Sequence, residues 1–184
     1  MRREEFDHVI AAAADIVGED SFVVIGSQAI LGSYADAPGD LLVSMEVDLY
    51  PRDDPEKAGE FEGVLGDGSQ FHRTFGYYAH AVGPETAKAP AGWEERLIPV
   101  VLPRRGASER SPVAYCLEPH DLVLAKCVRN DVRDWEYAGS ALRSGLVSGA
   151  TLLVRVDDLP IDDERRVHLR AMLDTLIGRE TGAV

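Results

Sequence analysis

The sequence predicts an α+β protein with a helical C-terminal part. Helical and strand-like hydrophobic patterns alternate along residues 1–118, whereas residues 119–184 show helical spacing alone. The length of 184 residues suits one compact unit. We therefore expect a single unit in which an α/β core, residues 1–118, carries the helical part, residues 119–184, packed on it.

The first elements of the core are a helix, a buried strand and a short second helix. Apolar residues at helical spacing predict a helix over residues 6–17. The apolar run of residues 22–25 predicts a buried strand that stops at Gly26, and a helix begins at Ser27. Residues 36–40 are rich in aspartate, proline and glycine, a composition typical of a loop.

Residues 43–50 predict a strand with two different faces. The apolar side chains of Val47 and Leu49 alternate with those of Glu46 and Asp48, which leave the opposite face. The remaining pattern of the core predicts a helix at residues 55–65, a turn at 66–69, strands at 75–82, 97–102 and 113–117, and a polar turn at 104–111.

The C-terminal part is predicted to begin with one long helix over residues 119–142, and a second helix spans residues 162–177. At about 100° per residue, the first helix has an apolar side and a basic side. The apolar side carries Leu124, Val128, Val132 and Trp135; the basic side carries Lys126, Arg129, Arg133 and Tyr137, flanked by Asp134. An ordinary amphipathic helix with a solvated charged face would show the same pattern.

Composition limits the classes of protein and partner. The hydrophobic fraction of 45% supports a folded core, and no stretch approaches the roughly 18 apolar residues of a membrane-spanning helix. The N-terminal residues lack the apolar segment of a secretory signal, and the two cysteines lack metal-site spacing, so we expect a cytoplasmic protein with reduced thiols. The formal net charge of −13 argues against extensive DNA binding, which needs a basic surface.

Glu46 and Asp48 are the strongest candidates for chemistry. Because they are two positions apart on one strand, we expect Cα atoms roughly 6.5–7 Å apart and both carboxylates on one face. Such a pair can hold divalent ions that activate an in-line phosphoryl attack. A solvated strand face that carries acids by chance is the alternative. His72, His80 and His120 lack ligand spacing, which favours surface or packing roles for them.

Gly26 and Ser27 lie where a strand turns into a helix. Gly26 allows a tight turn, and the Ser27 hydroxyl lies beside unpaired backbone N–H groups, which form a natural phosphate site. A simple helix cap would use the same residues. On the later basic face, Lys126 could neutralise triphosphate charge, Arg129 is a further candidate for nucleotide binding, and Asp134 could orient Lys126 or a substrate group.

These motifs resemble those of a known superfamily. Gly26-Ser27, followed by the acid-x-acid segment of residues 44–51, is similar to the signature of the nucleotidyltransferases. Residues 116–126 and the later Arg133-Asp134 resemble one bacterial branch of that superfamily, which comprises uncharacterised proteins similar to the AbiEii- and MenT-type toxins of toxin–antitoxin and abortive-infection systems. The resemblance covers residues 22–153.

The resemblance implies a mixed β-sheet flanked by helices, with Mg²⁺ on Glu46 and Asp48 and a nucleoside triphosphate near Gly26 and Ser27. It places Lys126 and Asp134 at the catalytic site. The implied reaction transfers a nucleoside monophosphate to an acceptor hydroxyl, which in the toxin branch belongs to a tRNA 3′ end or to a protein. A cognate antitoxin is then an expected partner.

The sequence also departs from the superfamily pattern. Glu46 stands where aspartate is usual, and residues 97–102 show no third carboxylate, a place that Glu118, Asp121 or Asp134 could take. The acids of residues 36–40 lie close to the expected phosphate site. These departures motivate a second reading of the chain as a catalytically inactive interaction or regulatory module with the same fold.

Overall fold

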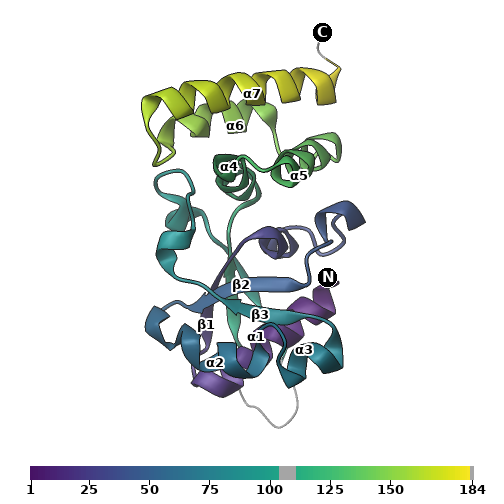
Figure 1. Ribbon diagram of the computed structural model, residues 1–184, viewed down its shortest axis with the longest axis vertical. Helices are drawn as coiled ribbons and strands as arrows, with labels where there is room; N and C mark the ends of the chain where they lie inside the picture. Colours follow the sequence, from purple (N-terminus) through teal and green to yellow (C-terminus); the bar gives the residue numbers. More distant parts are fainter. Residues whose placement is uncertain (104–110, 183–184) are drawn as a thin grey trace.

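The computed structural model describes residues 1–103 and 111–182, and it has the predicted α+β class. Five strands form one mixed sheet in the order β3-β2-β1-β5-β4 (Figure 1). The strands are β1 Ser21–Ile25, β2 Glu46–Pro51, β3 Tyr78–Ala81, β4 Ile98–Val101 and β5 Val113–Cys116. The polar turn expected at residues 104–111 lies, except for Ser111, outside the described residues.

Strand β2 has a different kind of neighbour on each side. It pairs antiparallel with the central strand β1, which places Ile25 opposite Asp48. It pairs parallel with the edge strand β3, which places Tyr78 opposite Glu46 and His80 opposite Asp48. On the other side of the sheet, β1 pairs parallel with β5, and β4 pairs antiparallel with β5.

The helices form two groups along the long axis of the molecule (Figure 1). The first group packs against the sheet and consists of α1 Arg3–Val17, α2 Ala58–Leu65 and α3 Gln70–Phe75. The second group is C-terminal and consists of α4 Pro119–Arg129, α5 Val132–Arg143, α6 Gly149–Arg155 and α7 Asp163–Thr181. In the described part of the chain, no helix combines the length and apolar character needed to cross a membrane.

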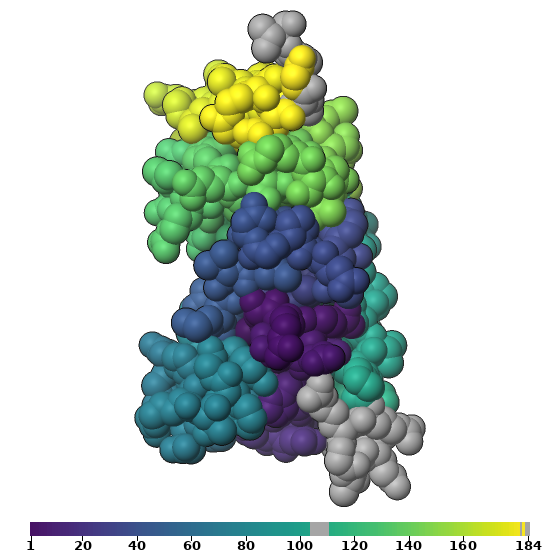
Figure 2. Space-filling view, turned by 90° about the vertical axis from the view of Figure 1, so that its right-hand side faces the viewer, coloured from purple at the N-terminus to yellow at the C-terminus, as the bar shows by residue number. Residues whose placement is uncertain are grey.

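Short 3-10 helices lie in four of the connections within residues 1–103 and 111–182. They are η1 Ser27–Gly32, η2 Gly39–Leu41, η3 Pro55–Lys57, η4 Pro84–Thr86, η5 Trp93–Arg96 and η6 Val156–Asp158. Helix α4 contacts η1 and helix α5 contacts η2, and in the space-filling view the C-terminal helices lie directly against the blue segment that contains η2 (Figure 2). The Tyr34 hydroxyl just after η1 donates to the carbonyl of Leu146, 2.9 Å away.

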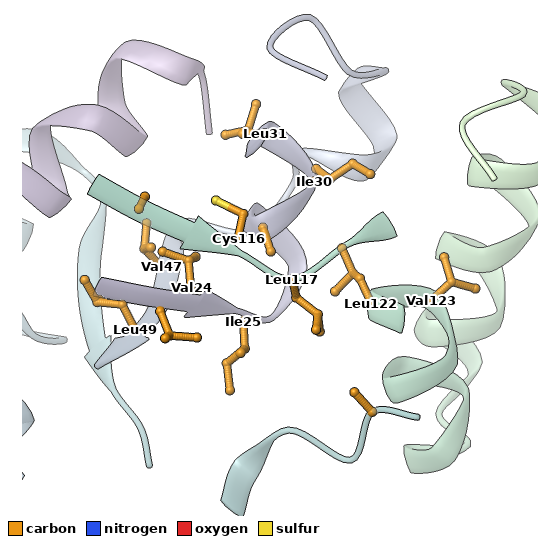
Figure 3. Packing of buried hydrophobic residues seen from close by; sticks show 14 of the residues in the cluster. Val24, Ile25, Ile30, Leu31, Val47, Leu49, Cys116, Leu117, Leu122 and Val123 are labelled. Atoms are coloured by element: carbon orange, nitrogen blue, oxygen red, sulfur yellow. The ribbon is translucent and has the colours of Figure 1, made fainter. Parts of the chain in front are cut away.

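The hydrophobic core explains why β2 exposes only one polar face. The central strand β1 is covered on both sides, so residues 22–25 are all buried, and they pack with Cys116 and Leu117 at the end of β5 (Figure 3). In β2, Val47 and Leu49 are fully buried in this core. Glu46 and Asp48 alternate with them and lie half-buried on the other face, as the period of two predicts.

The prediction of one continuous helix over residues 119–142 was wrong. Helix α4 ends at Asn130, whose φ of 60° lies in the left-handed region, and α5 restarts after Asp131, whose side chain accepts a hydrogen bond from the Arg133 N–H. The helical faces deduced for an unbroken helix fail accordingly. Val132, expected on the apolar side of the helix, is 73% exposed. Tyr137, expected on the basic side, is buried.

Other differences concern boundaries and short elements. The helix expected from Ser27 is a 3-10 helix of 6 residues, and β2 begins at Glu46 rather than at residue 43. The strand expected at residues 75–82 is shorter, because α3 occupies its first residue and the sequence did not indicate that helix. Helix α6 was also not predicted.

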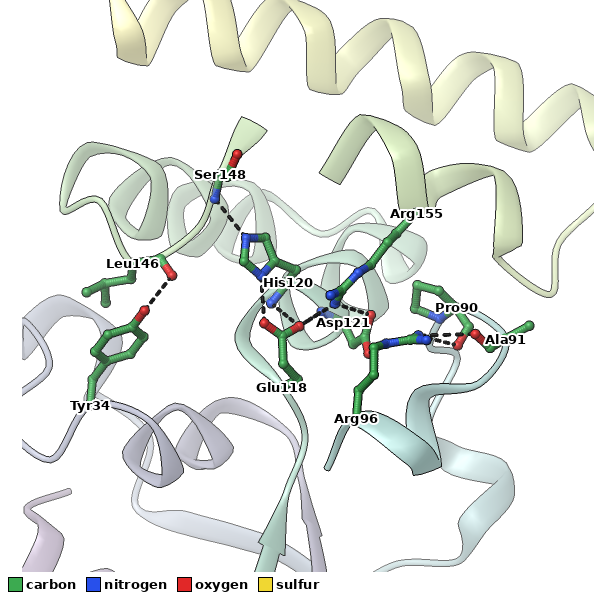
Figure 4. A network of polar contacts seen from close by, with 10 residues as sticks. All are labelled: Tyr34, Pro90, Ala91, Arg96, Glu118, His120, Asp121, Leu146, Ser148 and Arg155. Carbon is green, nitrogen blue, oxygen red and sulfur yellow. Dashed lines mark hydrogen bonds and ion pairs between the residues drawn. The ribbon is translucent and has the colours of Figure 1, made fainter. Parts of the chain in front are cut away.

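An ion-pair network joins the sheet to the C-terminal helices (Figure 4). Asp121, fully buried in α4, accepts from Arg96 Nε at 2.7 Å and from Arg155 Nη1 at 3.0 Å. Glu118 caps the start of α4, pairs with Arg155, and lies 2.6 Å from Nδ1 of His120. This network fixes where α4 leaves the sheet, and thus where its later side chains lie.

Glu118 makes the stability of this joint depend on pH. Burial acts to raise the pKa of Glu118, but the hydrogen bonds and charges of His120 and Arg155 outweigh it and lower the pKa from 4.5 to about 2. A carboxylate with a depressed pKa stabilises the folded state above the unfolded pKa, and that stability is lost as pH falls through the folded pKa.

We therefore predict that Glu118→Gln lowers the free energy of unfolding by roughly 1.5–3 kcal/mol at pH 7, because charge-assisted hydrogen bonds are lost. The difference from the wild type should shrink as pH falls from about 4.5 toward 2. Urea unfolding at a series of pH values measures it. A difference that stays constant over this range would contradict the assignment.

Candidate functional site

Three potential ligand side chains meet on the polar face of β2 and its neighbour β3. The Asp48 carboxylate Oδ1 lies 2.7 Å from Nδ1 of His80. The Tyr78 hydroxyl donates to Oε2 of Glu46 at 2.9 Å. One ligand atom from each of Glu46, Asp48 and His80 lies within 4.8 Å of the other two.

The sequence analysis missed His80, which it assigned to a surface or packing role. Its ring is half-exposed, but it belongs to the carboxylate cluster because the parallel register of β2 and β3 places it opposite Asp48. Tyr78 and His80 share the spacing of two that Glu46 and Asp48 show. That shared spacing was the signal in the sequence that could have indicated His80. It places His80 beside Asp48 only once the register between β2 and β3 is known.

Gly26 makes room for Asp48. Its φ of 68° and ψ of −173° lie in a region that is essentially confined to glycine. A Cβ atom at this position would overlap the Oδ2 atom of Asp48. The strand-to-helix turn therefore brings bare backbone against the carboxylate, which no residue with a side chain could do.

Burial and like charge both act on Asp48. Its pKa is raised, chiefly because burial disfavours the charged form and, in addition, because the Glu46 carboxylate lies nearby; the hydrogen bond from His80 and the charge of Lys126 oppose this. The Tyr78 hydroxyl has its pKa raised to about 12 by burial and by its hydrogen bond to Glu46, so it remains a donor at neutral pH. The cluster thus holds negative charge that its own neighbours only partly offset.

A basic cluster lies at the junction of α4 and α5. Arg129 donates to both oxygens of Asp134, from Nε at 3.0 Å and from Nη2 at 2.7 Å. Lys126 Nζ lies 3.3 Å from Oδ1 of Asp134 and 4.6 Å from the ring centroid of Tyr137. The Tyr137 hydroxyl donates to the Ser27 carbonyl at 3.1 Å, which ties this cluster to the glycine–serine turn.

Lys126 is a buried cation, since only 7% of it is exposed. Burial lowers the pKa of Lys126, and the charge of Asp134 acts in the opposite direction. The Arg129 side chain is 67% exposed, and the hydrogen bond to Asp134 raises its pKa. Lys126 and Arg129 are both close enough to Asp48 to act on it electrostatically.

The basic cluster and Glu46 of the carboxylate cluster line one cleft of about 1080 Å³. Ser27 and Glu46 line its sheet side, and Lys126, Arg129 and Asp134 line its helical side. Five of the residues singled out in the sequence therefore border one space, although they come from segments far apart in the chain. Gly26 and Asp48, the remaining two, are in contact at the edge of the Glu46 cluster.

Not every candidate for the third carboxylate joins this cleft. Glu118 and Asp121 are bound to arginines in the joint between the sheet and the helices. Asp134 is held by Lys126 and Arg129. Among the described residues, the third potential ligand beside Glu46 and Asp48 is the imidazole of His80. Asp40 lines the cleft, so the acidity expected near it is present.

Comparisons with known proteins assign no family. No protein-family model and no curated protein matches this chain, and no solved structure matches it.

The close approach of Gly26 and Asp48 gives a direct test of the geometry. We predict that Gly26→Ala lowers the free energy of unfolding by at least about 2 kcal/mol, because alanine is strained there and its Cβ displaces the Asp48 carboxylate. The control is Gly63→Ala in α2, where the added methyl meets nothing within 4 Å and should stabilise by about 0.5–1 kcal/mol. Equal stability of the two variants in urea unfolding would refute the packing described for Gly26.

Proposed function

We propose that the protein is an Mg²⁺-dependent nucleotidyltransferase with a nucleotidyltransferase-like fold, as its sequence motifs suggest. One observation carries the proposal: Glu46, a member of the carboxylate cluster, borders the same cleft as the basic cluster. A nucleoside triphosphate carries phosphates that need both cationic side chains and a divalent ion. The cleft volume of about 1080 Å³ is ample for such a ligand.

The donor set fits a divalent cation. Glu46 and Asp48 supply carboxylate oxygens on one strand face, and oxygen is the ligand that Mg²⁺ prefers. The raised pKa of Asp48 reflects burial and repulsion from Glu46, and a bound cation would offset both by stabilising the charged carboxylate. When bound there, the ion would neutralise phosphate charge and favour attack by an acceptor hydroxyl.

The helical side of the cleft supplies the remaining charge. Lys126 and Arg129 share Asp134, so their cationic groups are held in place before any ligand arrives. They can stabilise the negative charge that develops on the phosphates and on the departing pyrophosphate. On the sheet side, Ser27 offers a hydroxyl to the phosphates, and it is tied to the same cluster through Tyr137.

Three further arginines suit a larger acceptor. Arg133, Arg143 and Arg179 also line the cleft, and each of these side chains is at least half exposed and paired with a carboxylate. In a chain with a net charge of −13, such a group of arginines favours a locally bound anion. We propose an acceptor hydroxyl on an RNA, such as a tRNA 3′ end, or on a protein, which would fit the toxin of a toxin–antitoxin pair.

A second candidate function is a catalytically inactive interaction module. Specific contacts favour it: Glu46 and Asp48 each already have a hydrogen-bond partner, and Asp134 closes an ion pair with Arg129. Asp40 adds a further carboxylate to the cleft. In this reading the cleft would bind no nucleotide, so nucleotide binding separates the two functions.

We predict that the wild type binds at least one of the four nucleoside triphosphates in an Mg²⁺-dependent manner, measured by titration calorimetry. Asp48→Ala should weaken that binding and reduce nucleotidyl transfer at least about 100-fold, since a ligand of the divalent ion that would offset the phosphate charge is lost. The matched control is Asp53→Ala, because Asp53 is an exposed carboxylate that follows the same strand.

If a folded wild type binds none of the four nucleotides, the nucleotidyltransferase proposal is wrong and the interaction module is favoured. Equal transfer by folded Asp48→Ala and Asp53→Ala proteins would remove Asp48 from the proposed catalytic site.

A further inference from the structure

We propose that His80 is a metal ligand, and that Glu46, Asp48 and His80 together form a site that binds Mn²⁺ in preference to Mg²⁺. The inference rests on the metal-binding part of the proposed function and names the cation that this site selects. It starts from the composition of the cluster: a nitrogen donor, the His80 imidazole, lies beside the two carboxylates.

The distances suit three ligands of one ion. In an octahedral complex with metal–ligand bonds of about 2.1 Å, neighbouring ligand atoms lie about 3.0 Å apart and opposite ones about 4.2 Å apart. The Nδ1 atom of His80 and Oδ1 of Asp48 are 2.7 Å apart, and one ligand atom from each of the three residues lies within 4.8 Å of the other two. These separations are close to the octahedral ones, so side-chain adjustments can bring all three residues to one ion.

Neighbouring groups orient the three ligands. Tyr78 donates to Oε2 of Glu46, which leaves Oε1 without that bond and fixes the direction of the carboxylate. Gly26 confines Asp48 from the other side. The Gly26 backbone lies so close to the Asp48 carboxylate that a Cβ atom on Gly26 would overlap Oδ2 of Asp48. When a cation binds, His80 carries its proton on Nε2, and the bond from Nδ1 to the cation replaces the hydrogen bond from Nδ1 to Asp48. Strand pairing with β2 holds all of these residues in register.

The chemistry of the ligand set favours Mn²⁺ over Mg²⁺. Mg²⁺ takes oxygen ligands almost entirely and gains little from an imidazole. Divalent first-row transition metals accept imidazole nitrogen, and a set rich in carboxylate, with open positions for water or phosphate oxygens, suits Mn²⁺ among them. Mg²⁺ still binds this site through Glu46 and Asp48, but without help from His80.

The experiment is an electron paramagnetic resonance titration of the wild-type protein with Mn²⁺ and no nucleotide, followed by competition with Mg²⁺. We expect Mn²⁺ to bind at least about tenfold more tightly than Mg²⁺. Pulsed measurements on the Mn²⁺ complex should show coupling to an imidazole ¹⁴N nucleus, a signal that comes from a ligand and not from a histidine that only donates a hydrogen bond.

Two variants isolate the contribution of His80. His80→Asn keeps an N–H that can reach Asp48 but removes the imidazole, so the ¹⁴N coupling should vanish and Mn²⁺ affinity should fall about tenfold or more while Mg²⁺ affinity changes little. The control is His72→Asn, because the His72 ring packs 4.6 Å from the ring of Tyr78 but is not one of the three ligands. It should retain the signal and the preference.

Each contrary outcome overturns a different claim. If Mn²⁺ binds and Asp48→Ala abolishes binding, but the wild type shows no ¹⁴N coupling, His80 is not a ligand and the metal site of the proposed function survives. If a folded wild type binds neither Mn²⁺ nor Mg²⁺ at these residues, both the inference and the metal-dependent function are wrong. Equal affinities of the wild type for the two ions would overturn the selectivity.

Discussion

The register of β2 is the constraint on which the rest of the site depends. Because β2 pairs with β1 on one side and β3 on the other, Asp48 lies opposite Ile25, the residue before Gly26, and also opposite His80. A shift by one residue would turn Val47 and Leu49 out of the core and bury Glu46 and Asp48 in it. The hydrophobic core therefore specifies the position of the carboxylates as strongly as it specifies the fold.

The second half of the site depends on a break between helices. In an unbroken helix, Lys126 and Asp134 would be more than two turns apart, about 12 Å along the axis. The left-handed conformation of Asn130 folds α5 back onto α4, so the two side chains meet 3.3 Å apart. The Asp121 and Glu118 network then fixes α4 on the sheet, which directs the Lys126 cluster toward the same cleft as Glu46.

The sequence was informative where the pattern is local. The alternation around Glu46 and Asp48 and the apolar run of β1 follow from burial on one or two faces, so both strands could be predicted. His80 could not be, since its role depends on pairing between strands that are separated by two helices. Asn130-Asp131 did carry a stop and a start signal, but the helical periodicity on both sides concealed it.

The most direct test of the central claim is a crystal structure of the protein with Mn²⁺ and a non-hydrolysable nucleoside triphosphate analogue, in which anomalous scattering locates the metal. The account predicts a metal peak bonded to Glu46 and Asp48, with phosphates between that ion and the Lys126–Arg129 pair. A nucleotide bound outside the cleft, or a metal with no bond to either carboxylate, would contradict it.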